Sequence, residues 1–386
     1  MTGILINRKV FADAVEFAKT AVPEKPIMEA DGNITVAYAE GRLSISATDG
    51  CQGSKVFLAV DSGDIAPFSV GCDPKRLAKA LAKDTSEKLL LANNAEGLLV
   101  ADSDNAESKF TVLLGANMSR ASRMLVWQPK DKINDVSMSA DILADTLAFL
   151  EDFLPEGKDE GTKHDIAIIG TKVAHANNSV NMRGIVASQA FAFATPVCFR
   201  KKFVHNVVKA IRAMATDVVT VSDDVRMISI VSGDSNKFLV IPKSRQQPPV
   251  LPLEYMQAVG DPVDMDFKDV VKGLEKLSSA NYNSVTTVTG VDIVISGEPA
   301  DSTLQIKLED GRAAATYPIK RTTSGTVERL IDHKSFINLL KLFSKSADSK
   351  LHFGEDGTRY LRLMNKKTYG PLACANIAVC SYARKN

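Results

Sequence analysis

Positively charged side chains recur at helical spacing in the stretch DPKRLAKALAK, residues 73–83. Asp73 is of a type that caps helix N-termini, and Pro74 suits the first helical position. Leu77 and Leu81 fall on one face of such a helix, which leaves the opposite face basic. The basic residues of this face are Lys75, Arg76, Lys79 and Lys83. Such side chains attract phosphates through their charge, although a lysine-rich helix is also common as a plain solvated surface.

The residue types that usually carry catalysis or hold metals are scattered along the chain. The five cysteines form no CxxC pair, and the five histidines are dispersed, as is typical of surface or capping residues. The sequence has no nucleotide-binding glycine loop, HExxH or GxSxG motif. We therefore expect reduced thiols, no bound metal and no cofactor. Cys72, directly before the stretch 73–83, is either a thiol of lowered pKa or a small buried hydrophobic residue, and without a base nearby the second interpretation is favoured.

Length and composition are those of a soluble globular protein. The chain has 386 residues, too many for one ordinary core, so two or three domains are expected. Hydrophobic residues make up 45% of the chain, yet no apolar run approaches the length that spans a membrane. The N-terminus MTGILINRKV lacks the hydrophobic stretch of a secretory signal, so we expect a cytoplasmic protein with no membrane partner. The net charge of +1 neither requires nor excludes a nucleic-acid partner.

The elements that must position these residues alternate between single helices and blocks of strands. Helices are predicted at 7–20, 73–83, 139–153, 199–215, 266–280 and 332–346. Strands are predicted at 33–38, 42–47, 54–60, 68–70, 88–92, 97–101, 109–114, 166–170, 172–177, 185–195, 218–222, 227–232, 237–242, 285–289, 292–296, 304–308, 313–318, 350–354, 360–364 and 373–380. Six helices thus head six blocks of strands.

The spacing of the helices reveals a long repeat. The first helices of each third start at 7, 139 and 266, which are 132 and 127 residues apart, and the second helices start at 73, 199 and 332, which are 126 and 133 apart. Equivalent apolar positions are shared by Leu77, Phe203 and Phe336, and by Leu81, Val207 and Leu340. This period suits tandem domains at 1–125, 126–258 and 259–386, rather than a solenoid. The alternative is three unrelated α+β domains that look alike by chance.

Three short segments of the first third carry a resemblance to a known family. They are RLSISATDG at residues 42–50, EKPIM at 24–28 and ESKFTVLL at 107–114. In this order, and together with the repeat, they make the sequence resemble the sliding DNA clamps of the three-domain bacterial kind, the beta subunit of DNA polymerase III. The resemblance implies an α+β fold of three tandem clamp domains, each with two halves that combine a helix with an antiparallel sheet.

The resemblance also implies a function. Two clamp chains join head to tail into a closed ring, helices inside and sheets outside, that encircles duplex DNA and tethers a polymerase without sequence specificity and without catalytic activity. The expected partners are double-stranded DNA, a second copy of the chain in a homodimer, and a DNA polymerase and a clamp loader that bind through short peptide motifs. The alternatives are a clamp-fold binding scaffold that does not encircle DNA, and an enzyme whose site uses carboxylates or Cys72.

Basic helices suit a sliding ring because contacts to phosphates do not depend on base sequence. The residues expected to contact DNA are Lys25, Lys75, Arg76, Lys79, Lys83, Arg200, Lys201, Lys202, Lys209, Arg212, Lys272 and Lys341. Further bases on the predicted helices are Arg8, Lys9, Lys19, Lys268, Lys276, Lys334 and Lys345. The helix at 139–153 does not conform, because it carries only acids: Asp141, Asp145, Glu151 and Asp152. Either these acids point elsewhere, or the ring contacts DNA unevenly.

Two protein-binding sites follow from the resemblance. Phe110 lies on an edge-like strand, where an aromatic residue either packs in the core or anchors a second subunit, near Leu277 of the third domain. A pocket for partner peptides is expected at Arg183, Gly184, Ile185, Pro242, Arg245, Val379 and Tyr382. The tail reads VCSYARKN where the family typically has a Met-Pro-Met-Arg-Leu-like ending. This departure suggests a different polymerase partner, as for a phage or mobile-element clamp.

Overall fold

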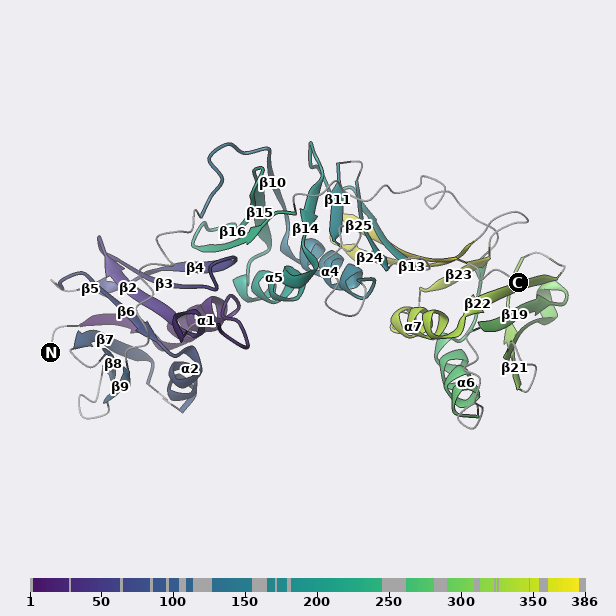
Figure 1. The fold of residues 1–386 in the computed structure, drawn as a ribbon, viewed down its shortest axis with the longest axis horizontal. Coiled ribbons are helices and arrows are strands. Elements are labelled where there is room, and N and C mark those ends of the chain that lie inside the picture. The colour runs from purple at the N-terminus through teal and green to yellow at the C-terminus, as the bar shows by residue number, and fades with distance from the viewer. Residues whose placement is uncertain are drawn as a thin grey trace. The chain divides into compact units, whose positions relative to one another are not determined.

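The computed structural model describes residues 3–27, 29–62, 65–83, 86–94, 97–103, 109–113, 127–154, 165–170, 172–178, 182–244, 262–280, 290–308, 313–322, 324, 326–346, 348–353 and 360–381 (Figure 1). These residues form α-helices and antiparallel sheets, so the α+β prediction is confirmed. The chain divides into two compact units, Met1–Ala148 with Phe193–Arg245, and Phe149–Ala192 with Gln246–Asn386. The predicted boundaries of the three domains stay a prediction.

Within the described residues, the first unit holds three complete helices and most of a fourth. They are α1 (Arg8–Lys19), α2 (Pro74–Lys83), α5 (Lys201–Met214) and α4 (Ala140–Glu151) up to Ala148, and a short 3-10 helix spans Glu29–Gly32. α1 packs against both α2 and α5, and Figure 1 shows α1 and α2 together beside the strands. Phe11 and Phe17 of α1 and Leu77 of α2 are completely buried. The apolar faces of the helices therefore form the core with the sheets.

The strands of the first unit form two antiparallel sheets. One has the order β5-β1-β7-β8-β9, with β5 (Asp61–Ser62), β1 (Ile4–Asn7), β7 (Lys88–Asn94), β8 (Gly97–Asp102) and β9 (Lys109–Leu113). The other has the order β10-β15-β16-β17-β4-β3-β2-β6, with β10 (Asn134–Ser139), β15 (Val218–Asp223), β16 (Met227–Ser232), β17 (Lys237–Pro242), β4 (Gly53–Ala59), β3 (Arg42–Thr48), β2 (Ile34–Ala39) and β6 (Phe68–Cys72). β17 pairs with β4, so strands of the first and second thirds share one sheet.

The second unit contains the end of α4 and two complete helices among its described residues. These are α6 (Phe267–Ala280) and α7 (His333–Phe343), which pack against each other. Strands run in the order β11-β12-β13-β25-β24-β23-β18, with β11 (Ile166–Ile169), β12 (Val173–Asn178), β13 (Met182–Ser188), β25 (Leu372–Ser381), β24 (Tyr360–Tyr369), β23 (Lys350–Phe353) and β18 (Pro262–Val263). A further sheet has the order β21-β20-β19-β22, with β21 (Ala314–Ile319), β20 (Ser302–Leu308), β19 (Gly290–Ser296) and β22 (Val327–Asp332), and a 3-10 turn at Pro299–Asp301.

Most helices begin at a side chain that caps them. Asp73 accepts hydrogen bonds from the backbone N–H groups of the second and third residues of α2, at 2.8 and 3.3 Å. Asn7, Asp266 and Asp332 cap α1, α6 and α7 in the same way. Such caps satisfy N–H groups that have no partner inside the helix. All six predicted helices are confirmed to within three residues at either end.

The structure corrects the strand predictions in two respects. The strand predicted at 185–195 is correct only up to Ser188, because β13 spans Met182–Ser188 and turns and loop follow up to residue 196. Several short strands escaped prediction, most of them directly ahead of a helix: β1, β5, β10, β18, β22 and β14 (Val197–Phe199). These strands are only two to six residues long, too short for a reliable local pattern, and pairing with distant strands stabilises them, as for β10 with β15. The strand predicted at 285–289 lies outside the described residues.

Candidate nucleic-acid interface

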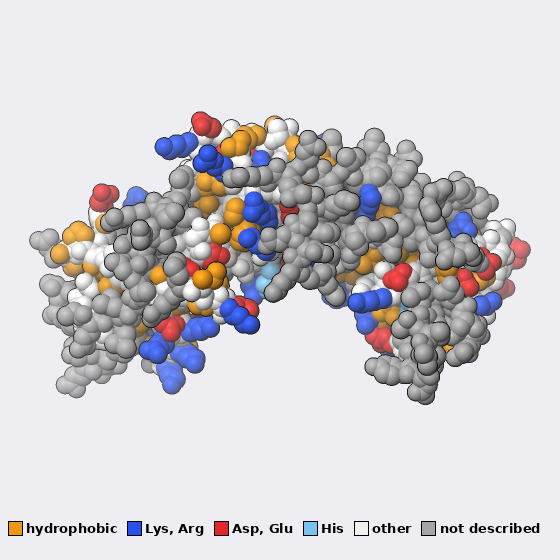
Figure 2. Space-filling model, in the orientation of Figure 1, with side chains coloured by type: hydrophobic (Ala, Val, Ile, Leu, Met, Phe, Trp, Pro, Cys, Tyr) orange, Lys and Arg blue, Asp and Glu red, His pale blue; other side chains and the backbone are white. Residues whose placement is uncertain are grey.

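The basic face of α2 is built as the sequence predicts. Leu77 and Leu81 are buried, which turns the opposite side of the helix toward solvent. The exposed residues are Lys75, Arg76, Lys79 and Lys83. Figure 2 shows basic side chains gathered over this helix. α2 itself contains no acid. Within the described part of the chain, Arg76 forms an ion pair with the capping Asp73, at 3.5 Å. The helix therefore concentrates positive charge, which suits a polyanion.

α5 presents a second basic face in the same unit. Phe203, Val207 and Ile211 are buried on its apolar side, and the helix contains no acid. Lys202, Lys209 and Arg212 are exposed, and Arg200 and Lys201 are half-buried. The guanidinium Nη2 of Arg212 lies 3.3 Å from the carboxylate Oδ1 of Asp145 on α4. α5 thus has an excess of basic charge that one acid of the neighbouring helix reduces.

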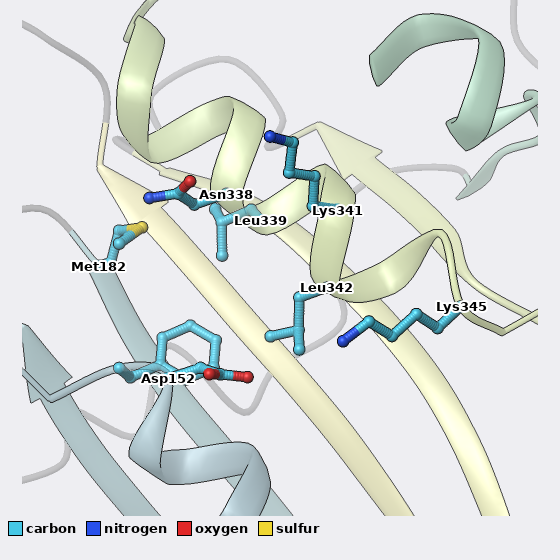
Figure 3. Close-up of a pocket in the computed structure, with 8 residues that line it drawn as sticks. Asp152, Met182, Asn338, Leu339, Lys341, Leu342 and Lys345 are labelled. Carbon is cyan, nitrogen blue, oxygen red and sulfur yellow. The ribbon is translucent and has the colours of Figure 1, made fainter. Parts of the chain in front are cut away.

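Two acids of α4 and its C-terminal end face bases of neighbouring helices. Asp145 pairs with Arg212, as above. Asp152 and Lys345 point toward each other in the second unit (Figure 3). Burial raises the pKa of the Asp152 carboxyl, and the positive charge of Lys345 acts in the opposite direction. Asp145 and Asp152 are thus directed toward bases of other segments, whereas Asp141 is exposed. Whether these acids point away from DNA or the ring contacts DNA unevenly stays a prediction.

Two of the basic residues of α6 and α7 form ion pairs with acids of α6. Lys272 pairs with Asp269 on the same helix at 3.5 Å, and Lys341 of α7 pairs with Glu275 of α6 at 2.7 Å. All four side chains are exposed, so these pairs contribute little to stability. Their main effect is on the electric field, because a nearby acid reduces the attraction of each lysine for a polyanion. The structure therefore predicts a weaker positive field here than at α2 and α5.

Arg8, expected to add charge to the helix faces, has a different position. Its Nε donates a hydrogen bond to the carbonyl of Ser86 at 2.8 Å, and its Nη1 donates to the carbonyl of Leu81 at 3.4 Å. The guanidinium thus binds the C-terminal end of α2 and joins α1 to the chain that follows α2. Lys19 pairs with Glu16 on α1 at 3.0 Å. Lys25 is exposed beyond α1, and its contact with DNA stays a prediction.

The segments predicted for a peptide pocket lie partly on paired strands. β13 pairs with β25 so that Arg183 lies opposite Val379 and Ile185 opposite Ile377. Ile185, Ile377 and Val379 belong to one buried apolar cluster with Val173. Pro242 ends β17 in the first unit, and Arg245 and Tyr382 lie outside the described residues. A peptide pocket at these residues stays a prediction.

Gly184 has a packing role on the other face of β13. A Cβ atom at this position would lie 2.4 Å from Cδ2 of Phe153, far inside van der Waals contact. Because neighbouring residues of a strand point to opposite faces, this direction is opposite to that of Arg183 and Ile185. The glycine thus lets the ring of Phe153, which is 1% exposed, lie directly on the strand.

The predicted dimer residues occupy different positions. Phe110 belongs to β9, which ends the order of its sheet and so is an edge strand among the described residues. An edge strand has unpaired backbone groups that another chain can use. Leu277 of α6 is buried, at 8% exposure, within the second unit. Their contact across a dimer stays a prediction.

The cysteines do not provide a nucleophile at the predicted position. Burial, aided by the negative charge of Asp73, raises the pKa of the Cys72 thiol to about 12. Burial likewise raises the pKa of Cys380 to about 12. Cys51 is exposed, whereas Cys198 and Cys374 are buried. Cys72 is therefore the small buried hydrophobic residue of the favoured interpretation.

Two lysines on strands have roles that the sequence analysis missed. Nζ of Lys237 donates to the carbonyls of Ala213 and Met214, at 3.1 and 2.8 Å, and so caps the C-terminus of α5. Nζ of Lys55 lies 4.6 Å from the ring centre of Phe57 and 5.7 Å from that of Trp127. Burial lowers the pKa of both lysines. Trp127 and the carbonyls of Ala213 and Met214 come from distant parts of the chain, so local periodicity carries no signal for these contacts.

One histidine lies in the interior of the second unit. His175 is completely buried in β12, contrary to the expectation of a surface or capping residue. Across the described ranges, no three or more His, Cys, Asp or Glu side chains are arranged to hold a metal ion. No helix in the same ranges is both long and apolar enough to cross a lipid bilayer.

The fold that positions these helices is that of the bacterial sliding clamps. Solved structures of this class match the chain over its whole length, so the resemblance seen in the sequence is confirmed at the level of the fold. No protein-family model matches the sequence, and no curated protein matches it. The fold was thus recognisable from backbone architecture, where sequence identity is very low.

Three of the similar structures share the fold at low sequence identity. A DNA polymerase III beta subunit from Thermotoga maritima matches with a TM-score of 0.76 and 13% identity. DNA polymerase sliding clamps from Pseudomonas aeruginosa and Caulobacter crescentus match with TM-scores of 0.75 and 0.71, at 10% and 13% identity. Each match covers 100% of both chains. The chain therefore has the clamp fold along its full length.

Proposed function

We propose that this protein is a DNA sliding clamp, a homodimeric ring that encircles duplex DNA and tethers a DNA polymerase without sequence specificity. The observation that carries the proposal is a full-length clamp fold whose α2 and α5 present basic faces with few neighbouring acids. Lysine and arginine contacts to phosphates exchange with water and counterions, so they hold DNA without fixing its register. In this proposal the protein has no catalytic activity of its own. It works in the cytoplasm, as a ring around the DNA.

The DNA-contacting residues of the proposal are those predicted from the sequence, with an order of importance that the structure suggests. The residues of α2 and α5 contribute most, because they are mainly exposed and α2 and α5 contain no acid. Lys272 and Lys341 contribute less, because α6 carries two acids, which lie 3.5 and 2.7 Å from their amines. Within α2 and α5 the same argument places Arg76 and Arg212 below the lysines, because each pairs with an acid. The DNA contact is therefore uneven around the ring.

The proposed protein partners are a DNA polymerase and a clamp loader that bind through short peptide motifs. The pairing of β13 with β25 supports their pocket, because it places Arg183 and Ile185 beside Val379 near the C-terminal tail. Pro242, Arg245 and Tyr382 complete the proposed pocket. The unusual tail VCSYARKN supports a polymerase different from that of typical bacterial clamps.

The test of this function is topological. The dimer is first dissociated by dilution and then reassembled by concentration in the presence of closed circular duplex DNA at low salt, so that the ring closes around the circle without a loader. The sample is moved to high salt and separated by gel filtration before and after a single restriction cut. High salt removes simple electrostatic binding, so only a ring around the DNA is retained. We expect retention on the circle and loss after the cut.

Two results would contradict the proposal. Equal retention on circular and linear DNA, or none on either, would favour the clamp-fold scaffold that does not encircle DNA. A monomeric mass at micromolar concentration, measured by sedimentation equilibrium, would exclude a stable ring. The triple variant in which Lys201, Lys202 and Lys209 are all replaced by Glu is the control for electrostatic DNA binding. It should bind DNA weakly at low salt and still form the homodimer.

A further inference from the structure

A pocket of about 310 Å³ lies between the end of α4 and the second half of α7, within the second unit. It is lined by Asp152, Phe153, Met182, Asn338, Leu339, Lys341, Leu342 and Lys345. In Figure 3 the carboxylate of Asp152 and the amine of Lys345 point toward each other across this space, while the amine of Lys341 points away from Asp152. Asp152 is the one carboxylate among the lining residues. The pocket therefore contains a single facing pair of opposite charges.

The two lysines of the pocket differ in their surroundings. Lys341 is directed to Glu275 of α6, at 2.7 Å. Lys345 is exposed and faces Asp152, whose surroundings include the apolar side chains of Phe153, Leu342 and Met182. Burial raises the pKa of Asp152, so its carboxylate is partly removed from water, and Lys345 opposes that rise. Both side chains remain exposed at the mouth of the pocket, so the attraction between them is moderate and can be exchanged for other ions.

Lys345 lies just past α7, on the side of the fold that the proposed function turns toward DNA. At this position the amine of Lys345 would meet a phosphate of the DNA. The phosphate would bind the same amine that the carboxylate of Asp152 faces. Two anions that compete for one cation repel each other, so the bound phosphate and the Asp152 carboxylate exclude one another in part. The occupant that fits the charge of Lys345 is thus a backbone phosphate of duplex DNA.

We propose that Asp152 is a built-in competitor for DNA at Lys345: it holds the amine of Lys345 in the pocket when DNA is absent and limits the strength of its phosphate contact when DNA is present. This inference rests on the proposed function and adds a regulating residue to its DNA contact. A weak, exchangeable contact at this helix suits a ring that must move along DNA. It also gives the acidic helix α4 a role other than plain repulsion.

The competition depends on the charge of Asp152. The charged group that faces it is Lys345. Lys341 on α7 also lines the pocket but points away toward Glu275, and Glu151 is the neighbour of Asp152 at the end of α4. Protonation of Asp152 would release Lys345 to phosphate. Because partial burial raises the pKa of Asp152 above its ordinary value, release begins at a higher pH than that ordinary value would give. The affinity gap between wild type and an uncharged variant should therefore shrink as the pH falls toward 5.

The test measures binding of the full chain to a fluorescein-labelled 30-base-pair duplex by anisotropy, at 50 and 200 mM salt. Asp152→Asn should tighten binding roughly threefold at low salt and have less effect at high salt. The same substitution in a Lys345→Gln background should give no gain. Asp152→Glu keeps the competing charge and should remain close to wild type.

Glu298→Gln is the matched control for net charge. Glu298 is exposed in the second unit, in the turn after β19, at the end of that strand away from the start of α7. Its variant should bind as wild type does. An unchanged affinity for Asp152→Asn, or a gain that persists without Lys345, would overturn the inference. If neither the wild type nor any variant bound DNA in a salt-sensitive way, the proposed function itself would be rejected together with this inference. Thermal melting of each variant verifies that it is folded.

Discussion

At the scale of single residues, Gly184 shows how the absence of a side chain shapes the second unit. Phe153 follows α4 and is buried against the backbone of β13, where a Cβ atom would lie 2.4 Å from its ring. Interiors are packed too closely to absorb such an overlap without movement of the ring or the strand. The glycine was predicted as part of a peptide pocket, and the structure adds this packing requirement.

Gly184→Ala is expected to lower the free energy of unfolding by about 1–3 kcal/mol, because the new methyl group displaces Phe153. Urea denaturation followed by circular dichroism measures this change. In a Phe153→Leu background the same substitution should cost clearly less, since the smaller side chain leaves room for the methyl group. Equal costs in the two backgrounds would show that Phe153 is not the obstacle.

Cys72 illustrates how burial determines reactivity. With its pKa raised to about 12, only about one thousandth of the Cys72 thiol is ionised at pH 9. We expect iodoacetamide at pH 9 to modify the exposed Cys51 while Cys72 stays unmodified until the protein is unfolded. Mass spectrometry of labelled peptides measures both sites in one sample. Labelling of Cys72 at the rate of Cys51 in the folded protein would contradict this assignment.

The pKa shift of Cys72 also sets a direction for stability. A thiol whose pKa is raised in the folded state adds to the free energy of unfolding. This contribution is complete below the ordinary pKa of 9.0 and is lost as the pH rises toward 12. Cys380 acts in the same direction. The neutral thiols are thus the forms that the fold requires.

At the scale of elements, the helices differ in how much of their positive charge is compensated. α2 and α5 contain bases and no acids, whereas α6 carries Asp269 and Glu275, which pair with Lys272 and with Lys341 of α7. All six helices occupy equivalent places in the repeat, so this difference comes from side chains and not from the fold. Duplex DNA in a ring of this kind would therefore be attracted most by α2 and α5.

Removal of two charges from α2, in Lys75→Gln with Lys79→Gln, should weaken DNA binding and reduce the slope of log K against log salt by about 2, as expected for two lost phosphate contacts. Anisotropy titrations from 50 to 200 mM salt measure the slope. The double substitution Lys88→Gln with Lys366→Gln removes the same charge from exposed positions on strands and should leave the slope nearly unchanged. Equal effects of the two pairs would mean that only net charge matters.

At the scale of the whole molecule, the edge strands determine where a second chain can join. β9 ends one sheet of the first unit, and β21 and β22 end a sheet of the second unit. Extension of such sheets by strands of another copy satisfies backbone groups that are otherwise left to water. A head-to-tail homodimer that joins β9 to an edge of the last sheet would close the proposed ring.

Phe110→Ala is expected to weaken the homodimer by tenfold or more, roughly the loss of one aromatic anchor at an interface. Sedimentation velocity across a dilution series measures the dissociation constant. Phe68→Ala is the matched control, since Phe68 lies half-buried on β6, the edge strand of another sheet, beside Tyr38. An unchanged dissociation constant for Phe110→Ala would support the core interpretation of this residue.

The sequence by itself determined the helices and their repeat. Capping residues such as Asp73 and Asp332, and apolar residues at helical spacing, act within one or two turns, so local pattern is sufficient to locate them. The basic face of α2 follows directly, because burial of Leu77 and Leu81 leaves only one side of the helix for its lysines. The predicted fold class followed from the repeat, and the match to solved clamps confirmed it.

Only the tertiary structure decided how strands join and which charges are compensated. The pairing of β17 with β4 and of β13 with β25 connects segments far apart in the chain, and short strands such as β10 exist only through such partners. The pairs Arg212 with Asp145 and Lys341 with Glu275 span 67 and 66 positions. The physical reason is that backbone pairing and electrostatics act through space, whereas periodicity in a sequence reports only neighbours along the chain.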